Sequence, residues 1–166
     1  MKHFWNNLLF VVSLVCFLAS ATMLVLELSD LPRDDLAAYE PGAHDLQILE
    51  LVNEVREGEG LQPLELDPQM CALAYVRARE AAELWSHTRP NGLECHSVYE
   101  EYGIDRDFWT GENLAGYALP DARQTVDSWL ESEAHRINIL YPDYTAAGIA
   151  VYHSGDRYYV ANLFRS

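Results

Sequence analysis

Apolar residues recur with the spacing of a helix in two segments near the start of the domain. After Asp45, which is placed to cap a helix, apolar residues recur at steps of three and four positions until Gly58 and Gly60. Asp67 followed by Pro68 is a favourable N-cap and first-turn pair for a second helix. We predict that this second helix packs closely through a face of small residues, among them Ala74, Ala78, Ala81 and Ala82.

A third helix is expected to open at Asp121, after Pro120, and to run toward Ser132, with Pro142 closing the segment that follows. Its inward-facing residues would be Val126, Trp129 and Leu130.

Near the C-terminus the pattern of side chains changes from one typical of helices to one typical of strands. Residues 147–153 and 157–164 are rich in β-branched and aromatic side chains, and Ser154-Gly155-Asp156 separates them at hairpin distance. Residues 110–117 are expected to form a further short strand. Helices followed by a small sheet between helices predict an α+β or three-layer fold.

The N-terminal region has a different composition. Residues 8–26 form a run of 19 residues without a charge, about the length that spans the hydrocarbon core of a bilayer. We interpret residues 1–28 as a signal peptide or membrane anchor. Ala19-Ser20-Ala21 fits signal peptidase cleavage, whereas the apolar residues that continue to Leu26 fit an uncleaved anchor.

Composition sets the domain organisation. The chain has 166 residues, of which 49% are hydrophobic, so it has room for one domain and an appendage. Residues 29–43 mix prolines, a glycine and acids without a sustained period, and we predict an acidic tether. Residues 44–166 are long enough to fold as one domain.

The charge excludes several partners. The chain carries 11 Lys+Arg against 26 Asp+Glu, a formal net charge of -15, and its only lysine is Lys2. A nucleic-acid binder needs a basic face, so no nucleic acid is expected as a partner. Docking on anionic lipid through a polybasic patch is also excluded, so membrane contact is expected only through the N-terminal segment.

Three polar groups of residues could carry chemistry, and each has a simple structural explanation by itself. His87 could be a cation at a helix C-terminus, Glu112 a solvated loop acid and His135 a surface residue. Their separations of 25 and 23 residues match no local metal-binding motif.

The order of these groups is more informative than any one of them. Together they resemble the superfamily of cysteine-rich secretory proteins, antigen 5 and pathogenesis-related proteins, also called CAP or SCP domains, and most closely its short bacterial secreted branch. The resemblance runs from about Leu46 to Phe164. It rests on Val52-Asn53-Glu54-Val55-Arg56, Leu61-Gln62-Pro63-Leu64, Arg77-Ala78-Arg79-Glu80, Ser86-His87-Thr88-Arg89-Pro90-Asn91-Gly92, Gly111-Glu112-Asn113-Leu114-Ala115, Trp129 with Ser132, His135-Arg136 with Asn138-Ile139-Leu140, and Gly148-Ile149-Ala150-Val151.

The resemblance implies an α/β/α sandwich with a small antiparallel sheet between helical layers. It also implies that His87, Glu112 and His135 converge in one open cleft, where the histidines can bind a divalent metal such as zinc. Glu112 would be either a third ligand or the acceptor that orients an imidazole. The alternative is a hydrogen-bonded polar cluster that holds helix and sheet together and binds no metal.

The chain departs from the family pattern at one position of this cleft. Eukaryotic members have a second acid where this chain has Ser132, as is usual in the bacterial branch, with Glu131 and Glu133 on either side. Ser132 is therefore the fourth cleft residue that the resemblance implies, and the sequence leaves open whether either neighbouring acid reaches the cleft.

No single reaction is common to the family, so the sequence leaves enzymatic activity open. We expect an exported binding or interaction module at the cell envelope, whose partner is an envelope component, a lipid or a protein. One alternative is a metal-dependent, peptidase-like hydrolase using zinc-bound water, although the sequence shows no separate general base. The other is a lipid- or sterol-binding module, although no distinctive apolar loop is visible.

Export would place Cys71 and Cys95, the only cysteines of the domain, in an oxidising setting. We expect a disulfide between them, the alternative being two buried free thiols. Closing a loop of roughly 25 residues would stabilise the fold by about 3 kcal/mol.

Overall fold

The computed structural model describes residues 39–105, 108–119 and 121–166. The predicted signal peptide or anchor, residues 1–28, lies outside these ranges. Within them, no helix is both long enough and apolar enough to span a bilayer. The end of the predicted tether lies on the domain, because Tyr39 stacks on Tyr75 at 4.8 Å between ring centroids and donates a hydrogen bond to Asp45 at 2.7 Å.

A four-stranded sheet in the order β1-β3-β4-β2 forms the centre of the fold. The predicted strand is confirmed as β2 (Thr110–Tyr117), and the predicted hairpin as β3 (Ala146–Ser154) and β4 (Arg157–Arg165). β4 lies antiparallel between β2 and β3. The fourth strand, β1 (Glu65–Leu66), was not expected and pairs parallel with β3. A two-residue strand has too short a pattern to be recognised from sequence.

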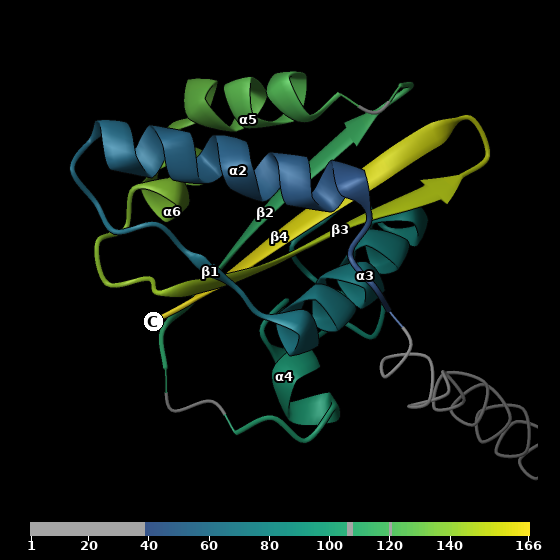
Figure 1. The fold of residues 1–166 in the computed structure, drawn as a ribbon. Helices are drawn as coiled ribbons and strands as arrows, with labels where there is room; N and C mark the ends of the chain where they lie inside the picture. The colour runs from purple at the N-terminus through teal and green to yellow at the C-terminus, as the bar shows by residue number, and fades with distance from the viewer. Residues whose placement is uncertain (1–38, 106–107, 120) are drawn as a thin grey trace, which may run out of the picture. The chain divides into compact units, whose positions relative to one another are not determined.

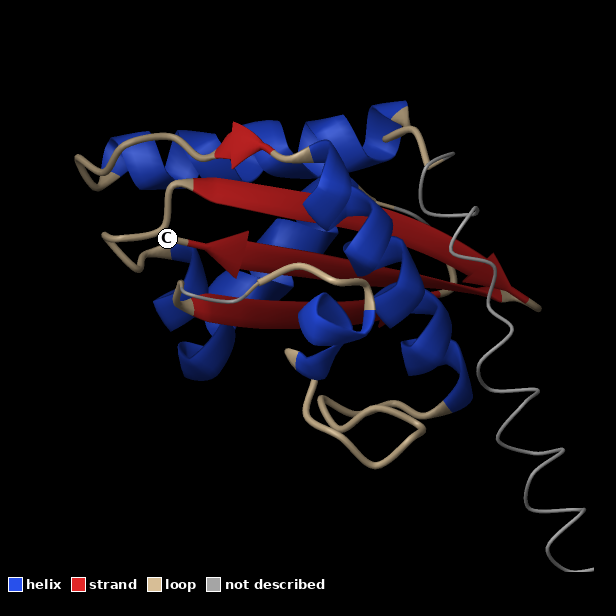
Figure 2. Cartoon of the chain, turned by 90° about the horizontal axis from the view of Figure 1, so that it is seen from below, coloured by secondary structure: helices blue, strands red, loops and turns tan. Residues whose placement is uncertain are grey.

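Helices cover both faces of the sheet, so the expected three-layer α/β/α fold is confirmed (Figure 1). One layer contains α2 (Ala43–Gly58), α5 (Ala122–Glu131) and α6 (Glu133–Ile139). The other contains α3 (Pro68–Glu83) and α4 (Ser97–Glu101), which lie in front of the red strands in Figure 2.

Two of the three predicted N-caps are confirmed. The carboxylates of Asp67 and Asp121 accept hydrogen bonds from backbone N–H groups in the first turns of α3 and α5. The prediction for Asp45 was wrong, because α2 begins after Gly42 and Asp45 lies inside its first turn. From there its carboxylate accepts the N–H of Gly42 at 2.7 Å, so it satisfies the same helix end from a later position.

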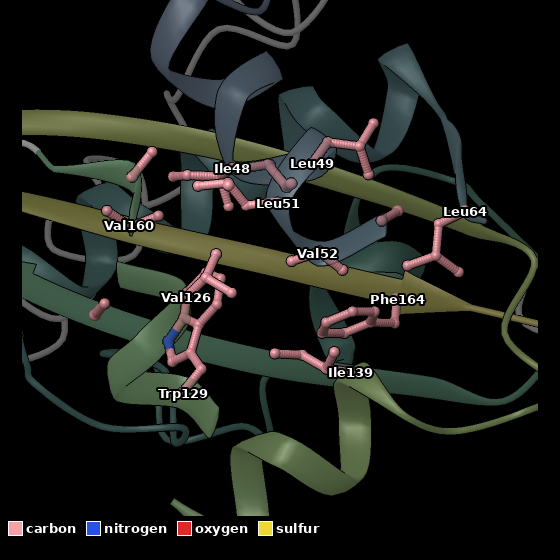
Figure 3. Packing of buried hydrophobic residues seen from close by; sticks show 14 of the residues in the cluster. Ile48, Leu49, Leu51, Val52, Leu64, Val126, Trp129, Ile139, Val160 and Phe164 are labelled. Atoms are coloured by element: carbon pink, nitrogen blue, oxygen red, sulfur yellow. The ribbon is translucent and has the colours of Figure 1, made fainter. Parts of the chain in front are cut away.

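Each face of the sheet has its own hydrophobic cluster. The cluster beneath α2, α5 and α6 is seen in Figure 3, where Val126, Trp129, Ile139 and Phe164 lie between the helices and the strands. The indole Nε1 of Trp129 also donates to the backbone oxygen of Leu114 at 3.0 Å. The aromatic ring therefore fills the core and satisfies a carbonyl of β2 at the same time.

The small-residue face of α3 lies against β3 and β4. Ala74, Ala78 and Ala81 are buried there. The backbones of α3 and β3 approach so closely at Gly148 that a Cβ on this residue would lie 2.1 Å from the carbonyl carbon of Met70. Only glycine fits at this crossing.

The expected disulfide is absent, and this prediction was wrong. Cys71 and Cys95 are both free thiols. Cys71 lies in α3 near the backbone of Ile149, whereas Cys95 precedes α4 and has Glu112 among its charged neighbours. Burial raises the pKa of each thiol to about 11, which keeps both protonated. The two cysteines lie in different surroundings, so the presence of two in the domain did not lead to a disulfide.

Candidate functional site

Glu112 lies at the centre of the candidate site, on β2, with a side chain that reaches Arg77 of α3. It is only 6% exposed, and both carboxylate oxygens have partners. Arg77 donates to it from Nε at 2.6 Å and from Nη2 at 3.1 Å. His87 Nδ1 lies 2.8 Å from Oε1. A bidentate guanidinium compensates for burying the carboxylate charge.

Buried arginines fix the loop that carries His87. Arg77, which is fully buried, also pairs with Glu80 and donates to the backbone oxygen of Ser86 at 3.1 Å. Arg89, 1% exposed, pairs with Glu80 and with Glu101, each at 2.7 Å. The loop from Ser86 to Arg89 is therefore attached to α3 and α4 at both ends.

His87 projects from this loop with about half of its side chain, 53%, exposed. α3 ends at Glu83, so His87 does not cap the helix, and the simple structural explanation for it was wrong. The hydrogen bond with Glu112 raises the pKa of His87, and partial burial opposes the shift. When the neutral ring donates from Nδ1 to Glu112, its Nε2 presents a free lone pair.

His135 comes to the same place from α6. Its ring centroid lies 6.2 Å from that of His87, with 59° between the ring planes. Burial lowers the pKa of His135, and the neighbouring His87 lowers it further. We call His87, Glu112 and His135 the histidine site.

Two asparagines position α6 against β2. Asn113 donates to the backbone oxygen of His135 at 3.0 Å. Asn138 donates to the backbone oxygen of Glu112 at 3.2 Å and to the side-chain oxygen of Asn113 at 2.9 Å. Sequence reasoning assigned no role to Asn113, Asn138 or Arg77, although all three lie in the quoted motifs. Asn113 directly follows Glu112, whereas Asn138 follows His135 by three residues and Arg77 precedes His87 by ten, so only Asn113 had an adjacent signal in the sequence.

The structure puts Ser132 at the joint between α5 and α6, where it ends one helix and begins the next. Its neighbours Glu131 and Glu133 are exposed. Across residues 39–105, 108–119 and 121–166, no three His, Cys, Asp or Glu side chains are arranged to hold a metal ion. A metal at the histidine site would therefore have two protein ligands, His87 and His135.

The donor set can be tested against zinc. Zn–N bonds of about 2.0–2.1 Å and a tetrahedral angle place two ligating imidazoles roughly 5 Å apart between ring centroids. The observed 6.2 Å is about 1 Å longer, so the two rings would move closer together on binding zinc. One imidazole also has a carboxylate on its other nitrogen, the usual support for a metal-ligating histidine. The residue types and the carboxylate behind His87 are therefore those of a zinc site.

Comparison with known sequences gives the family. The pattern of the cysteine-rich secretory protein family, CAP, matches residues 49–164. The chain belongs to this family. The match leaves out only the first turns of α2 and the last residue of β4 among the described helices and strands, so the histidine site lies inside the CAP domain.

Two curated relatives come from Bacillus subtilis (strain 168). The uncharacterized protein YkwD is 30% identical over 116 residues, which make up 68% of this chain and 44% of YkwD. The uncharacterized membrane protein YlbC is 33% identical over 121 residues, or 72% of this chain and 34% of YlbC. The chain thus spans less than half the length of either relative.

Solved structures share the fold. An extracellular protein containing an SCP domain from Bacillus anthracis str. Ames is 27% identical with a TM-score of 0.65, covering 74% of this chain and 40% of that one. An outer surface protein from Borrelia burgdorferi is 23% identical with a TM-score of 0.66, covering 76% of this chain and 96% of that one.

Proposed function

We propose that this CAP protein is exported and acts as a binding or interaction module at the cell envelope, with a divalent metal such as zinc held by His87 and His135. The extracellular and surface location of its structural neighbours supports the setting. The uncharged run at residues 8–26 supports export of this chain.

The observation that carries the metal proposal is the connection from Arg77 through Glu112 to His87. Both oxygens of Glu112 have partners, so in this proposal Glu112 is the acceptor that orients His87 rather than a third ligand. A purely structural cluster would not need the Nε2 of His87 to be free on a half-exposed ring.

A structure of NaASP2 with Zn2+ supports the choice of metal. It shares the fold at a TM-score of 0.54 and 15% identity, and the match covers 74% of this chain and 80% of that one. The zinc was found in NaASP2, which is a different protein. It makes zinc the first ion to test here.

Two protein ligands leave coordination positions for an incoming group. Bound zinc would supply a Lewis acid for a carboxylate or carbonyl of a partner. Hydrolysis would in addition need a general base at the metal, and the buried acid of the site has no free oxygen for that role. The arrangement therefore favours binding over catalysis.

Calorimetric titration of zinc into the metal-free full chain at pH 7.5 tests the proposal. We expect His87→Ala and His135→Ala each to remove most of the affinity, and the double variant to lose little more, because one ion is shared. His153→Ala is the matched control, since His153 is an exposed histidine stacked on Tyr158 in the hairpin.

Two results would contradict the metal proposal. One is the absence of zinc binding by the wild-type chain below about 100 µM. The other is equal binding by the wild type and the double variant, which would leave the structural polar cluster as the role of the histidine site.

A further inference from the structure

A groove of about 340 Å³ lies where α3 ends beside the far end of β2 and the start of β4. Two alanines of α3 form part of its lining, and the rest comes from Glu83, Trp85, Gly116, Arg157 and Tyr159. We call this the Trp85 groove. None of its residues belongs to the histidine site.

Two aromatic rings form the apolar walls of the groove. The ring centroids of Trp85 and Tyr159 are 6.2 Å apart with 51° between their planes, so the rings form an open corner. The indole lies on the strand at Gly116, where even a Cβ would be within ordinary contact distance, 3.4 Å, of two atoms of the Trp85 ring. Trp85 is nevertheless 57% exposed, which leaves a large indole surface available to a ligand.

The charged side chains of the groove are one carboxylate and one guanidinium. Glu83 and Arg157 are both exposed, and both line the groove. A carboxylate only accepts hydrogen bonds and a guanidinium only donates them, whereas a hydroxyl group does both. The two charges cancel locally, although the chain as a whole carries -15. This combination suits a neutral ligand with several hydroxyl groups.

We propose that the Trp85 groove binds a pyranose ring of a neutral glycan. The C–H face of the ring lies on the indole of Trp85, and its hydroxyl groups bond to Glu83 and Arg157. The volume is at the lower end of the range for small-molecule sites, as expected for a site that takes one or two sugar units. An apolar peptide side chain would use the aromatic corner and make no hydrogen bond to Glu83 or Arg157.

The groove and the histidine site are separate along β2, and they are nearest at the loop after α3, where Trp85 precedes His87 by two residues. Gly116 follows Glu112 by four residues, which corresponds to about 13 Å of extended strand. Sugar binding therefore needs no metal, and it would supply an envelope ligand for the proposed binding module. The two proposals can fail independently.

The test uses the full chain in a detergent without a sugar headgroup, because glycosidic detergents would compete. β-1,4-linked tetramers of glucose and of N-acetylglucosamine are titrated in, with tryptophan fluorescence and calorimetry as readouts. We expect saturable binding that Trp85→Ala weakens by about tenfold or more. Glu83→Gln should weaken it less, because the amide keeps one acceptor oxygen.

Trp109→Ala is the matched control, because Trp109 is 74% exposed and does not line the groove. It should bind sugar like the wild type, as should the His87→Ala/His135→Ala variant and the wild type with chelator. Absence of binding to both tetramers, or equal binding by Trp85→Ala, would overturn the proposal. So would binding of apolar peptides in place of sugars with the same dependence on Trp85.

Discussion

Single residues of the histidine site differ in their electrostatic surroundings although the two rings are neighbours. His87 faces a carboxylate, and its pKa is raised by that hydrogen bond. For His135 burial is the larger influence, and it lowers the pKa. Because the pKa of His87 is raised and that of His135 is lowered, a metal must compete with a proton more strongly at His87 than at His135.

In the metal-free protein, His87 should titrate above the ordinary histidine value of about 6.5 and His135 below it. An NMR titration of the imidazole protons, assigned with His87→Gln and His135→Gln, measures both. Coincident titrations, or the reverse order, would contradict the environments described.

The same shift predicts how stability depends on pH. Because the folded state raises the pKa of His87, its contribution is fully present below the unfolded value of about 6.5 and is lost as pH rises through the raised value. His87→Gln should therefore destabilise the protein more at a pH below about 6.5 than at a pH above the raised pKa of His87. Denaturant unfolding of the wild type and the variant at both pH values measures this difference. His135 contributes with the opposite sign, so the comparison is made between wild type and the His87 variant alone.

At the scale of elements, the contact of α3 with β3 sets the distance between the sheet and the layer that carries Arg77. Both backbones meet at Gly148, where added atoms would collide with the main chain of Met70 and Cys71. Main-chain atoms cannot move aside as a flexible side chain can, so the helix itself would have to shift.

Gly148→Ala should lower the free energy of unfolding by about 3 kcal/mol or more. Gly58→Ala is the control, since nothing lies within 4 Å of a Cβ there and alanine favours the helix. Urea unfolding of both variants measures the difference. A Gly148→Ala midpoint equal to that of the wild type would show that the two backbones are farther apart.

A second element-scale contact comes from Arg56, a fully buried arginine of α2. It donates to the backbone oxygens of Gln62, Ile139, Tyr141 and Tyr144. This one side chain joins α2, the connector before β1 and the turn after α6. It therefore helps to fix the end of α6, the helix that carries His135.

At the scale of the whole molecule, the proposal of export rests on the uncharged run at residues 8–26 and can be tested in cells. Fractionation of cells expressing the chain should place the CAP domain outside or on the membrane. N-terminal sequencing would then distinguish cleavage near Ala21 from retention as an anchor. Recovery of the intact chain as a soluble cytoplasmic protein would contradict export.

Much of the fold could be predicted because its elements carry local signals. The period and caps of α3 and α5 and the strand composition of β2, β3 and β4 each lie within one short segment of sequence. The third helix was predicted to run toward Ser132, where α5 ends, but α6 was not predicted, because its seven residues are too few to show a clear helical period. The order of motifs, from His87 to His135, also identified the family before any contact was known.

Tertiary structure alone decided how these residues work together. Arg77 and Glu112 are 35 residues apart, and Glu112 and His87 are 25 apart, yet all three meet at the two oxygens of one carboxylate. No local pattern encodes such a contact, because it depends on how α3 and the following loop pack on β2. The same reason explains the free thiols of Cys71 and Cys95 and the Trp85 groove: sequence supplied the residue types, and packing chose their partners.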